Sequence, residues 1–213
     1  MGIILFGAPG SGKGTQLTML SDFFHLKKIS LGDILRAEVK KDSTLGQEVK
    51  NFMEKGLLVP DELVSRVIEE NLDTDAFILD GYPRNINQVM TLEKILKRKM
   101  LTLTSIIFFD VDQDTIIDRL SKRRVCKKCF AVYHLTSMPS KKDGVCDNCG
   151  GELIQRNDDK PDVIKKRWEV FVTESKAILD HYAGKNKLLA VNGKGNKTEI
   201  FERIKDQVEC KKP

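Results

Sequence analysis

The chain has 213 residues, of which 40% are hydrophobic and 31% are charged. A chain of this length buries about 70% of its extended surface on folding. The composition therefore supplies enough apolar material for a core, and it excludes a disordered or collagen-like protein. The 36 basic and 31 acidic residues leave a net charge of +5, which is small for a protein dedicated to nucleic acid.

Nothing in the sequence indicates a membrane segment. No apolar run approaches the roughly 18 residues that would cross a bilayer. Residues 3–6 lack the basic flank and cleavage site of a signal peptide, and Phe6 stands where a myristoylation pattern needs Ser or Thr. We therefore expect a cytoplasmic protein with no membrane partner.

Short apolar or β-branched runs alternate with longer helical stretches. The predicted strands are residues 2–6, 28–30, 76–79, 105–111 and 187–191. The clearest predicted helices are residues 61–72, which follow Pro60 and begin with an acidic turn, and residues 161–182. Strands that alternate with helices predict an α/β fold around a parallel sheet.

A glycine-rich loop follows the first predicted strand. From Gly7 to Thr15 the sequence reads Gly-Ala-Pro-Gly-Ser-Gly-Lys-Gly-Thr, and a helical stretch comes next. In a phosphate-binding loop, glycines let backbone N–H groups surround the phosphate oxygens, and the lysine supplies a positive charge. The alternative is an ordinary glycine turn, but the order of strand, glycines, lysine, hydroxyl and helix favours a phosphate site. Gly14 stands where most such loops carry a hydroxyl ligand for Mg²⁺, and the hydroxyl follows at Thr15.

The third predicted strand ends in Asp80-Gly81-Tyr82-Pro83-Arg84. An aspartate at the carboxyl end of a parallel strand beside a phosphate loop is placed to organise Mg²⁺. Asp80 could instead cap the turn, and Arg84 could face solvent. Because Gly81 permits close backbone approach, we favour a phosphate ligand at Arg84.

Four of the five cysteines form two close pairs, Cys126/Cys129 and Cys146/Cys149. A C-x2-C…C-x2-C pattern with a spacer of 16 residues predicts a structural zinc site of four thiolates. Residues 125–152 contain few large aliphatic side chains, so this segment needs such a staple. Two disulfides, iron in place of zinc, and a nucleic-acid-binding knuckle remain as alternatives.

Residues 119–128 carry six positive charges and no acid. Such a run is either a solvated surface or a polyphosphate site, and the run alone does not decide between them.

Together these motifs resemble the nucleoside monophosphate kinases, most closely the bacterial adenylate kinases of the long-lid, zinc-containing type. The resemblance covers nearly the whole chain. Besides the glycine-rich loop it rests on residues 29–36, 57–61, 80–84 with Gln88, 119–124, 156–159 and Arg167.

The resemblance implies a role for each matching residue. The catalytic group would be Lys13, Asp80, Arg84, Arg119, Arg123, Arg156 and Arg167. The ATP site would comprise Gly10, Ser11, Gly12, Lys13, Gly14, Thr15, Arg119, Arg123, Val132, Tyr133 and Lys194. The AMP site would comprise Leu31, Arg36, Leu57, Leu58, Val59, Gly81, Tyr82, Pro83, Arg84, Gln88, Arg156 and Arg167.

The implied architecture is a five-stranded parallel P-loop NTPase core flanked by helices, with two inserted lobes. The core would be residues 1–29, 60–121 and 160–213, the monophosphate-binding lobe 30–59, and the zinc-stapled lid 122–159. The implied activity is reversible transfer of the terminal phosphoryl group from Mg-ATP to AMP, giving two ADP and maintaining the adenine nucleotide balance. We expect a monomer that binds ATP, AMP and ADP, uses Mg²⁺ in catalysis and Zn²⁺ in its lid, and binds no nucleic acid.

Two alternatives stay open at this point. Leu31 replaces the threonine usual in the family, so a related kinase acting on GTP with AMP, or on UMP or CMP, remains conceivable. A zinc-ribbon protein that binds nucleic acid is the alternative outside this enzyme class.

Overall fold

A computed structural model describes residues 1–41 and 44–210. Residues 42–43 of the predicted monophosphate-binding lobe and 211–213 of the predicted core lie outside the described residues. The elements of the main body are β1 (Gly2–Gly7), α1 (Lys13–Phe24), β2 (Lys27–Ser30), α4 (Asp61–Asn71), β3 (Phe77–Asp80), α5 (Ile86–Arg98), β4 (Leu103–Asp110), α6 (Gln113–Ser121), α7 (Pro161–Ala183), β8 (Leu188–Asn192) and α8 (Lys197–Glu209).

The main sheet has five strands in the order β2-β3-β1-β4-β8, and every neighbouring pair is parallel. The five strands predicted from the sequence are confirmed, as are the helices predicted at residues 61–72 and 161–182. After β1 the chain forms β2 and β3 on one side of β1, and it then crosses over to add β4 and β8 on the other side. Ligands of parallel sheets bind at such a reversal, outside the carboxyl ends of the strands.

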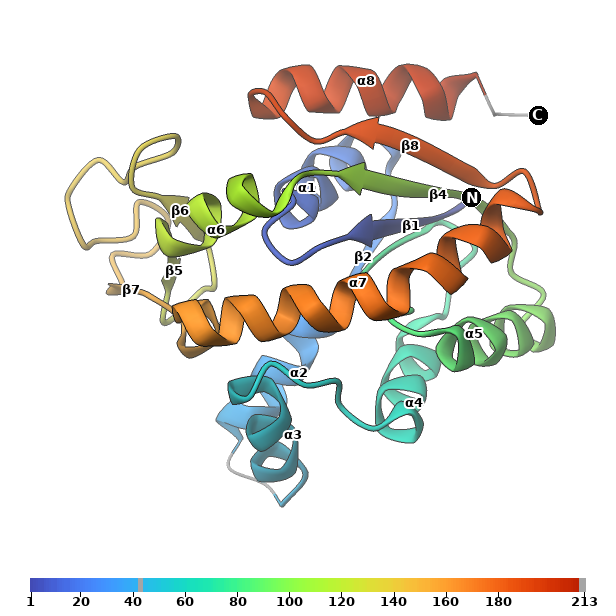
Figure 1. The fold of residues 1–213 in the computed structure, drawn as a ribbon, viewed down its shortest axis with the longest axis horizontal. Helices are drawn as coiled ribbons and strands as arrows, with labels where there is room; N and C mark the ends of the chain where they lie inside the picture. The colour runs from blue at the N-terminus through green and yellow to red at the C-terminus, as the bar shows by residue number, and fades with distance from the viewer. Residues whose placement is uncertain (42–43, 211–213) are drawn as a thin grey trace.

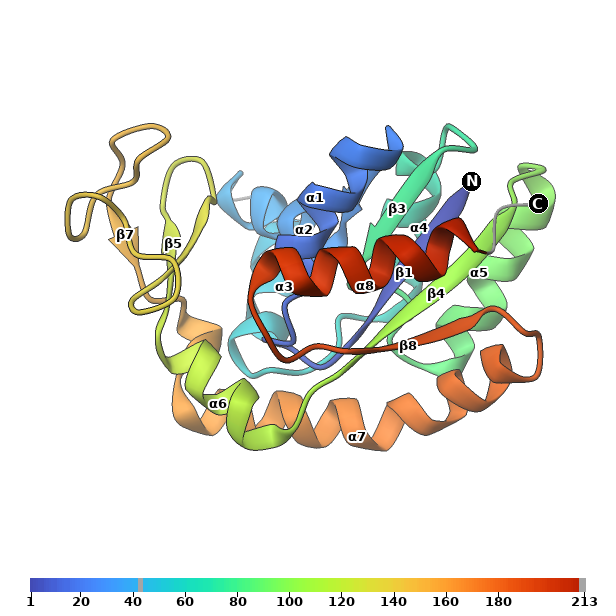
Figure 2. The same cartoon turned by 90° about the horizontal axis from the view of Figure 1, so that it is seen from above.

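The strands of this sheet are buried on both faces, which is why they read as continuous apolar runs. On one face Ile4 and Phe6 join a core cluster with residues of α4, α5 and α7. On the other face Ile3 and Leu5 join a cluster with residues of α1 and α8. Figure 1 shows α8 and α1 on one side of the sheet and α7 on the other, and Figure 2 shows the same layers from above.

A second, smaller sheet lies outside the main body. It is antiparallel, in the order β6-β5-β7, and its strands are β5 (Arg123–Cys126), β6 (Val132–His134) and β7 (Leu153–Ile154). These strands have two to four residues each, too short to display a hydrophobic alternation, so the sequence did not predict them. The short helix η1 (Asn157–Asp159) returns the chain to α7.

A third region consists of α2 (Leu31–Lys40) and α3 (Thr44–Glu54), which pack against each other. They lie below the main sheet in the view of Figure 1, and Leu31, Leu35 and Val49 join the same buried cluster as Ile4. Among the helices of the described residues, none combines the length and the apolar character that a bilayer crossing requires.

Candidate active site

The glycine-rich loop connects β1 to α1 at the carboxyl edge of the sheet. Gly10 and Gly12 adopt φ angles of 82° and 101°, which favour glycine. A Cβ on Gly10 would lie 2.7 Å from Leu120, so packing also demands glycine here. Ser11 is fully buried, whereas a Cβ built on Gly14 would meet no atom of the described residues within 4 Å beyond its own stretch of α1. The loop therefore has a fixed shape below the start of α1, where a phosphate would meet the positive end of the helix.

Lys13 lies over this loop. Its Nζ donates to the carbonyls of Gly7 and Ala8 at 2.7 and 2.8 Å and lies 3.4 Å from the Ser11 hydroxyl. Burial lowers the pKa of Lys13 to about 8, and the positive charges of neighbouring arginines act in the same direction, opposed by Asp80. An ammonium group that burial destabilises gains strongly from an anionic partner, such as a phosphate.

Asp80 ends β3 opposite Leu5 of β1, which brings its carboxylate to the glycine-rich loop. Burial raises the pKa of Asp80, while the charges of Lys13 and Arg84 oppose the rise. Its Oδ1 is buried and has no hydrogen-bond partner among the described residues. A buried carboxylate oxygen without a donor fits the role of holding a hydrated Mg²⁺.

A cavity opens beside this edge of the sheet, between α2, the segment before α4, the β3–α5 loop and the start of α7. It is lined by Leu31, Gly32, Leu35, Arg36, Met53, Gly56, Leu57, Leu58, Val59, Val64, Arg84, Gln88, Arg156, Asp158 and Arg167. Nine residues of the predicted AMP site are thus brought together: Leu31, Arg36, Leu57, Leu58, Val59, Arg84, Gln88, Arg156 and Arg167. The cavity combines an apolar wall with four guanidinium groups, which suits a base and a phosphate.

Two glycines make room for two of these arginines. A Cβ on Gly81 would lie 3.2 Å from the guanidinium of Arg84, and one on Gly32 would lie 3.1 Å from that of Arg36. Burial lowers the pKa of both Arg36 and Arg84. The glycine after Asp80 therefore serves the arginine side chain directly.

The other members of the predicted AMP site do not line this cavity. Tyr82 is 1% exposed and belongs to the core, where its hydroxyl lies 3.0 Å from the Ser65 hydroxyl and 3.2 Å from the Gln88 carbonyl. Gly81 and Pro83 flank it in the β3–α5 loop. These residues shape the loop that carries Arg84.

Two aspartates hold the arginines of the lid base, and sequence reasoning assigned neither of them a role. Asp159 is fully buried and accepts from Arg123 at 2.6 and 2.8 Å. Asp158 accepts from Arg156 at 2.6 and 2.8 Å and pairs with Arg167 at 3.2 Å. Although burial opposes its ionisation, the guanidinium groups of Arg167 and Arg156 hold the pKa of Asp158 well below its ordinary value. The signal available in the sequence was the Asn-Asp-Asp run between two arginines.

Arg119 joins the glycine-rich loop to the segment after β8. Its guanidinium donates to the carbonyls of Ser11 at 3.2 Å and Gly193 at 2.9 Å. Next to Gly193, Lys194 pairs with Asp112 at 2.5 Å. Arg119 therefore links the glycine-rich loop to the segment that carries Lys194.

The two predicted ATP-site residues in the lid have different environments. Val132 is 44% exposed on β6. Tyr133 is 7% exposed, and its hydroxyl lies 3.4 Å from the Cys146 sulfur and accepts from the Asp147 N–H at 2.8 Å. Tyr133 thus supports the cysteine cluster.

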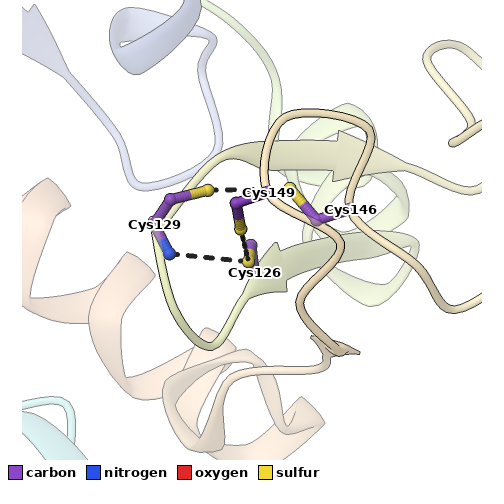
Figure 3. A group of neighbouring side chains, drawn as sticks. All are labelled: Cys126, Cys129, Cys146 and Cys149. Atoms are coloured by element: carbon purple, nitrogen blue, oxygen red, sulfur yellow. Dashed lines mark hydrogen bonds between the residues drawn. The ribbon is translucent and has the colours of Figure 1, made fainter.

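The four paired cysteines meet in the lid, as Figure 3 shows. Their sulfur atoms all lie within 4.8 Å of one another. The Sγ–Sγ distance is 3.4 Å between Cys126 and Cys149 and 3.6 Å between Cys129 and Cys146. Zinc–sulfur bonds of about 2.3 Å in a tetrahedron give sulfur separations of about 3.8 Å. The cluster therefore could hold a metal ion of this size, and no disulfide joins these cysteines.

The lid touches the α2–α3 region. Lys40 Nζ donates to the Lys127 carbonyl at 2.7 Å and lies 3.9 Å from the centre of the Phe130 ring. Asn157 donates to Glu54 at 3.3 Å. Lys127 stands between the first two cysteines, so this contact reaches the cluster itself.

Comparison with known proteins decides the family. The sequence model of adenylate kinase matches residues 5–187. The chain belongs to the adenylate kinase family. It is 44% identical over 209 residues to the adenylate kinase of Caldanaerobacter subterraneus subsp. tengcongensis, an alignment that covers 96% of this chain and 95% of that protein. It is 41% identical over 206 residues to the adenylate kinase of Fervidobacterium nodosum, covering 95% and 94%, and 40% identical over 208 residues to that of Clostridium tetani, covering 96% of both.

This membership confirms the enzyme class, the kinase fold and the family resemblance predicted from the sequence. It does not favour the alternatives of a kinase with another donor or acceptor or of a nucleic-acid-binding zinc ribbon. Adenylate kinases act on nucleotides and use Mg-ATP.

Proposed function

We propose that this chain transfers the terminal phosphoryl group reversibly from Mg-ATP to AMP, giving two ADP, and so balances the adenine nucleotides. The observation that carries the proposal is the cavity that unites Arg36, Arg84, Arg156 and Arg167 with an apolar wall. It lies beside Lys13, whose pKa responds to the charges of Arg84 and Arg167. A monophosphate in the cavity would thus lie next to a polyphosphate on the glycine-rich loop.

The reaction needs no strong general base. The phosphate of AMP has a second pKa of about 6, so its oxygen is largely ionised at neutral pH. A new bond forms between that oxygen and the terminal phosphorus as the bond to the bridging oxygen of ATP breaks, and ADP leaves with the electron pair. Catalysis then consists of aligning the two nucleotides and stabilising the charge on the transferred group.

The charged residues of the predicted site would divide these tasks among them. Backbone N–H groups of the glycine-rich loop and Lys13 would bind the donor phosphates. Arg36 and Arg84 would bind the acceptor phosphate from one side, and Arg156 and Arg167 from the other. Arg123 and Arg167 both pair with Asp159, which brings Arg123 next to these arginines. A guanidinium group suits such a position because its planar fork can contact two phosphate oxygens at once.

Two metal ions are part of the proposal. Mg²⁺ bound with ATP neutralises charge on the donor phosphates, and Asp80 would hold it, since the Asp80 Oδ1 lacks a donor among the described residues. Zn²⁺ would bind Cys126, Cys129, Cys146 and Cys149, whose four sulfurs suit a closed tetrahedral site. A site without an open position serves structure and takes no part in the transfer.

We further propose that residues 122–159 act as a lid and 30–59 as a monophosphate-binding lobe on a core of 1–29, 60–121 and 160–213. Water competes with AMP as acceptor, so the site has to exclude water before transfer. The contact of Lys40 with Lys127 and Phe130 supports this division, because it joins the two lobes across the site. We also propose a cytoplasmic monomer, since one chain supplies every group that the reaction requires.

The deciding experiment measures ADP formation by the purified protein with Mg-ATP and each of AMP, UMP, CMP and GMP. A reaction without acceptor provides the blank. Fast turnover with AMP is expected. Preference for another monophosphate would contradict the acceptor assignment, and rates equal to the blank with all four would contradict the enzyme assignment.

A further inference from the structure

Gln88 lines the cavity proposed to bind the acceptor, and both the nitrogen and the oxygen of its side-chain amide are hydrogen-bonded within the protein. Its Nε2 donates to Asp61 Oδ1 at 2.7 Å, and its Oε1 accepts from the Arg84 backbone N–H at 2.7 Å. Gln88 is 1% exposed, so water does not replace these partners. The amide of a glutamine can turn over to exchange its oxygen and nitrogen, and the partners decide which orientation is occupied.

The partner of Nε2 is itself held in place. Asn85 begins α5, where its Oδ1 accepts from the Gln88 backbone N–H at 2.8 Å. Its Nδ2 then donates to Asp61 at 3.0 and 3.3 Å. The backbone carbonyl of Gln88 accepts from the Tyr82 hydroxyl at 3.2 Å. Each of these donors therefore meets an acceptor, and the second N–H of the Gln88 amide is left for a ligand.

Turning the Gln88 amide would reverse two favourable contacts. Its Oε1 would face the carboxylate of Asp61, and its Nε2 would face the N–H of Arg84. A buried acceptor against an acceptor and a buried donor against a donor are both strongly unfavourable. One orientation is thus imposed on an amide that still has one N–H and one lone pair to offer.

Nucleobases differ in the group that such an amide reads. Adenine carries an amino donor at position 6, and cytosine carries one at position 4. Guanine and thymine carry carbonyl acceptors at these positions, as do hypoxanthine and uracil. An amide that can turn over pairs with either class. An amide held in one orientation forms both hydrogen bonds only with the class whose donor and acceptor stand in the matching order.

We propose that Asp61 is a specificity-determining positioning residue, which holds the Gln88 amide in the orientation that accepts amino bases and rejects keto bases. This inference rests on the proposed function, because Gln88 has to face the base of the acceptor. Asp61 itself does not contact the base and acts through Gln88 alone.

The test compares kcat/KM for four acceptors, AMP and IMP as the purine pair and CMP and UMP as the pyrimidine pair. Asp61→Asn presents either an oxygen or an NH2 group to Gln88, so both amide orientations become permitted. We expect the AMP-to-IMP ratio to fall by about tenfold or more, since a good bidentate amide–base pair discriminates by about that factor. The CMP-to-UMP ratio falls as well. A merely structural role would lower all four values by one factor and leave both ratios unchanged, which would overturn the inference.

Two controls isolate the route of the effect. Glu62→Gln removes the adjacent exposed carboxylate and leaves both ratios unchanged. In a Gln88→Ala background, Asp61→Asn adds no further change in the ratios. A further change there would show that Asp61 acts by another route and would overturn the proposal.

The unaltered protein gives an independent reading if Asp61→Asn does not fold, which its melting temperature detects. It has to prefer AMP to IMP by about tenfold or more, and equal use of the two overturns the inference while leaving the kinase assignment intact. Absence of turnover with every acceptor contradicts the proposed function as well.

Discussion

The main body and the lid reach a fixed structure by different means. In the main body a five-stranded sheet is covered on both faces, and its two clusters contain most of the large buried side chains. The buried cluster of the lid consists of Cys126, Tyr133 and Cys146. A segment this short cannot bury enough apolar surface to fold alone. Its four paired cysteines lie close enough to hold a metal ion, which would supply the missing stabilisation. The comparison shows that the small lobe places four thiolates where the main body places aliphatic side chains.

The largest expected effect concerns chemistry in the main body. Lys13→Met removes the charge that is proposed to stabilise the transferred phosphoryl group, while keeping most of the side-chain volume. We expect kcat to fall by about 100- to 1,000-fold, the usual cost of losing one strong transition-state contact. Steady-state assays measure it, with Lys165→Met on the exposed face of α7 as the control. A loss below tenfold would contradict the assignment of Lys13.

The second prediction separates the lid from the main body. Cys146→Ser is expected to weaken metal binding by about 100-fold or more, because it removes a ligand from a closed site. Turnover falls with metal content, while the cooperative unfolding of the main body changes little. Metal analysis, activity and calorimetry on the same samples test this. Cys210→Ser, at an exposed cysteine outside the cluster, leaves all three unchanged.

A matched pair of valines sharpens the comparison. Val191 on β8 is 2% exposed and Val125 on β5 is 6% exposed. Val191→Ala is expected to lower the free energy of unfolding by about 1.5–3 kcal/mol. Val125→Ala changes the same transition by less than about 0.5 kcal/mol and instead speeds metal release. Urea unfolding followed by circular dichroism distinguishes the two, and equal effects would show that lid and main body unfold as one unit.

The fourth prediction concerns pH. The pKa of Lys13 is lowered to about 8 by burial, so its ammonium is charged below that pH and loses its proton above it. We expect kcat/KM for ATP to fall above pH 8 by up to about tenfold per pH unit. The unfolded lysine keeps its proton to higher pH, so the contribution of Lys13 to stability rises over the same range. In Lys13→Arg the fall in kcat/KM disappears, because guanidinium remains charged.

The smallest effect lies between the two inserted lobes. Lys40→Met removes the contacts with the Lys127 carbonyl and the Phe130 ring. An exposed cation–π contact contributes about 0.5–1 kcal/mol, so kcat/KM falls by about two- to fivefold. Metal content stays unchanged. Lys41→Met, at the next position of the chain, provides the control, and an equal loss there would contradict a specific contact.

Much of the fold could be read from the chain in order. The strands were predictable because buried parallel strands form continuous apolar runs, and Pro60 and Pro161 precede helices whose periodicity is clear. The three-stranded lid sheet was not predicted, since strands of two to four residues show no period. Within the candidate site, the sequence indicated the residues proposed to bind ligands. It did not indicate the carboxylates that hold those side chains in place, such as Asp158 and Asp159.

The sequence by itself determined the groups whose spacing along the chain is their signature. The glycine-rich loop, Asp80 at a strand end and the four cysteines are of this kind, because local geometry dictates which residues can occupy such positions. Only the tertiary structure decided which charges neutralise one another and which amide is held in one orientation. Asp61 and Gln88 are 27 residues apart in the chain, and a hydrogen bond of 2.7 Å between them exists only after two helices have packed. Such contacts depend on distances in space, and those depend on the whole core.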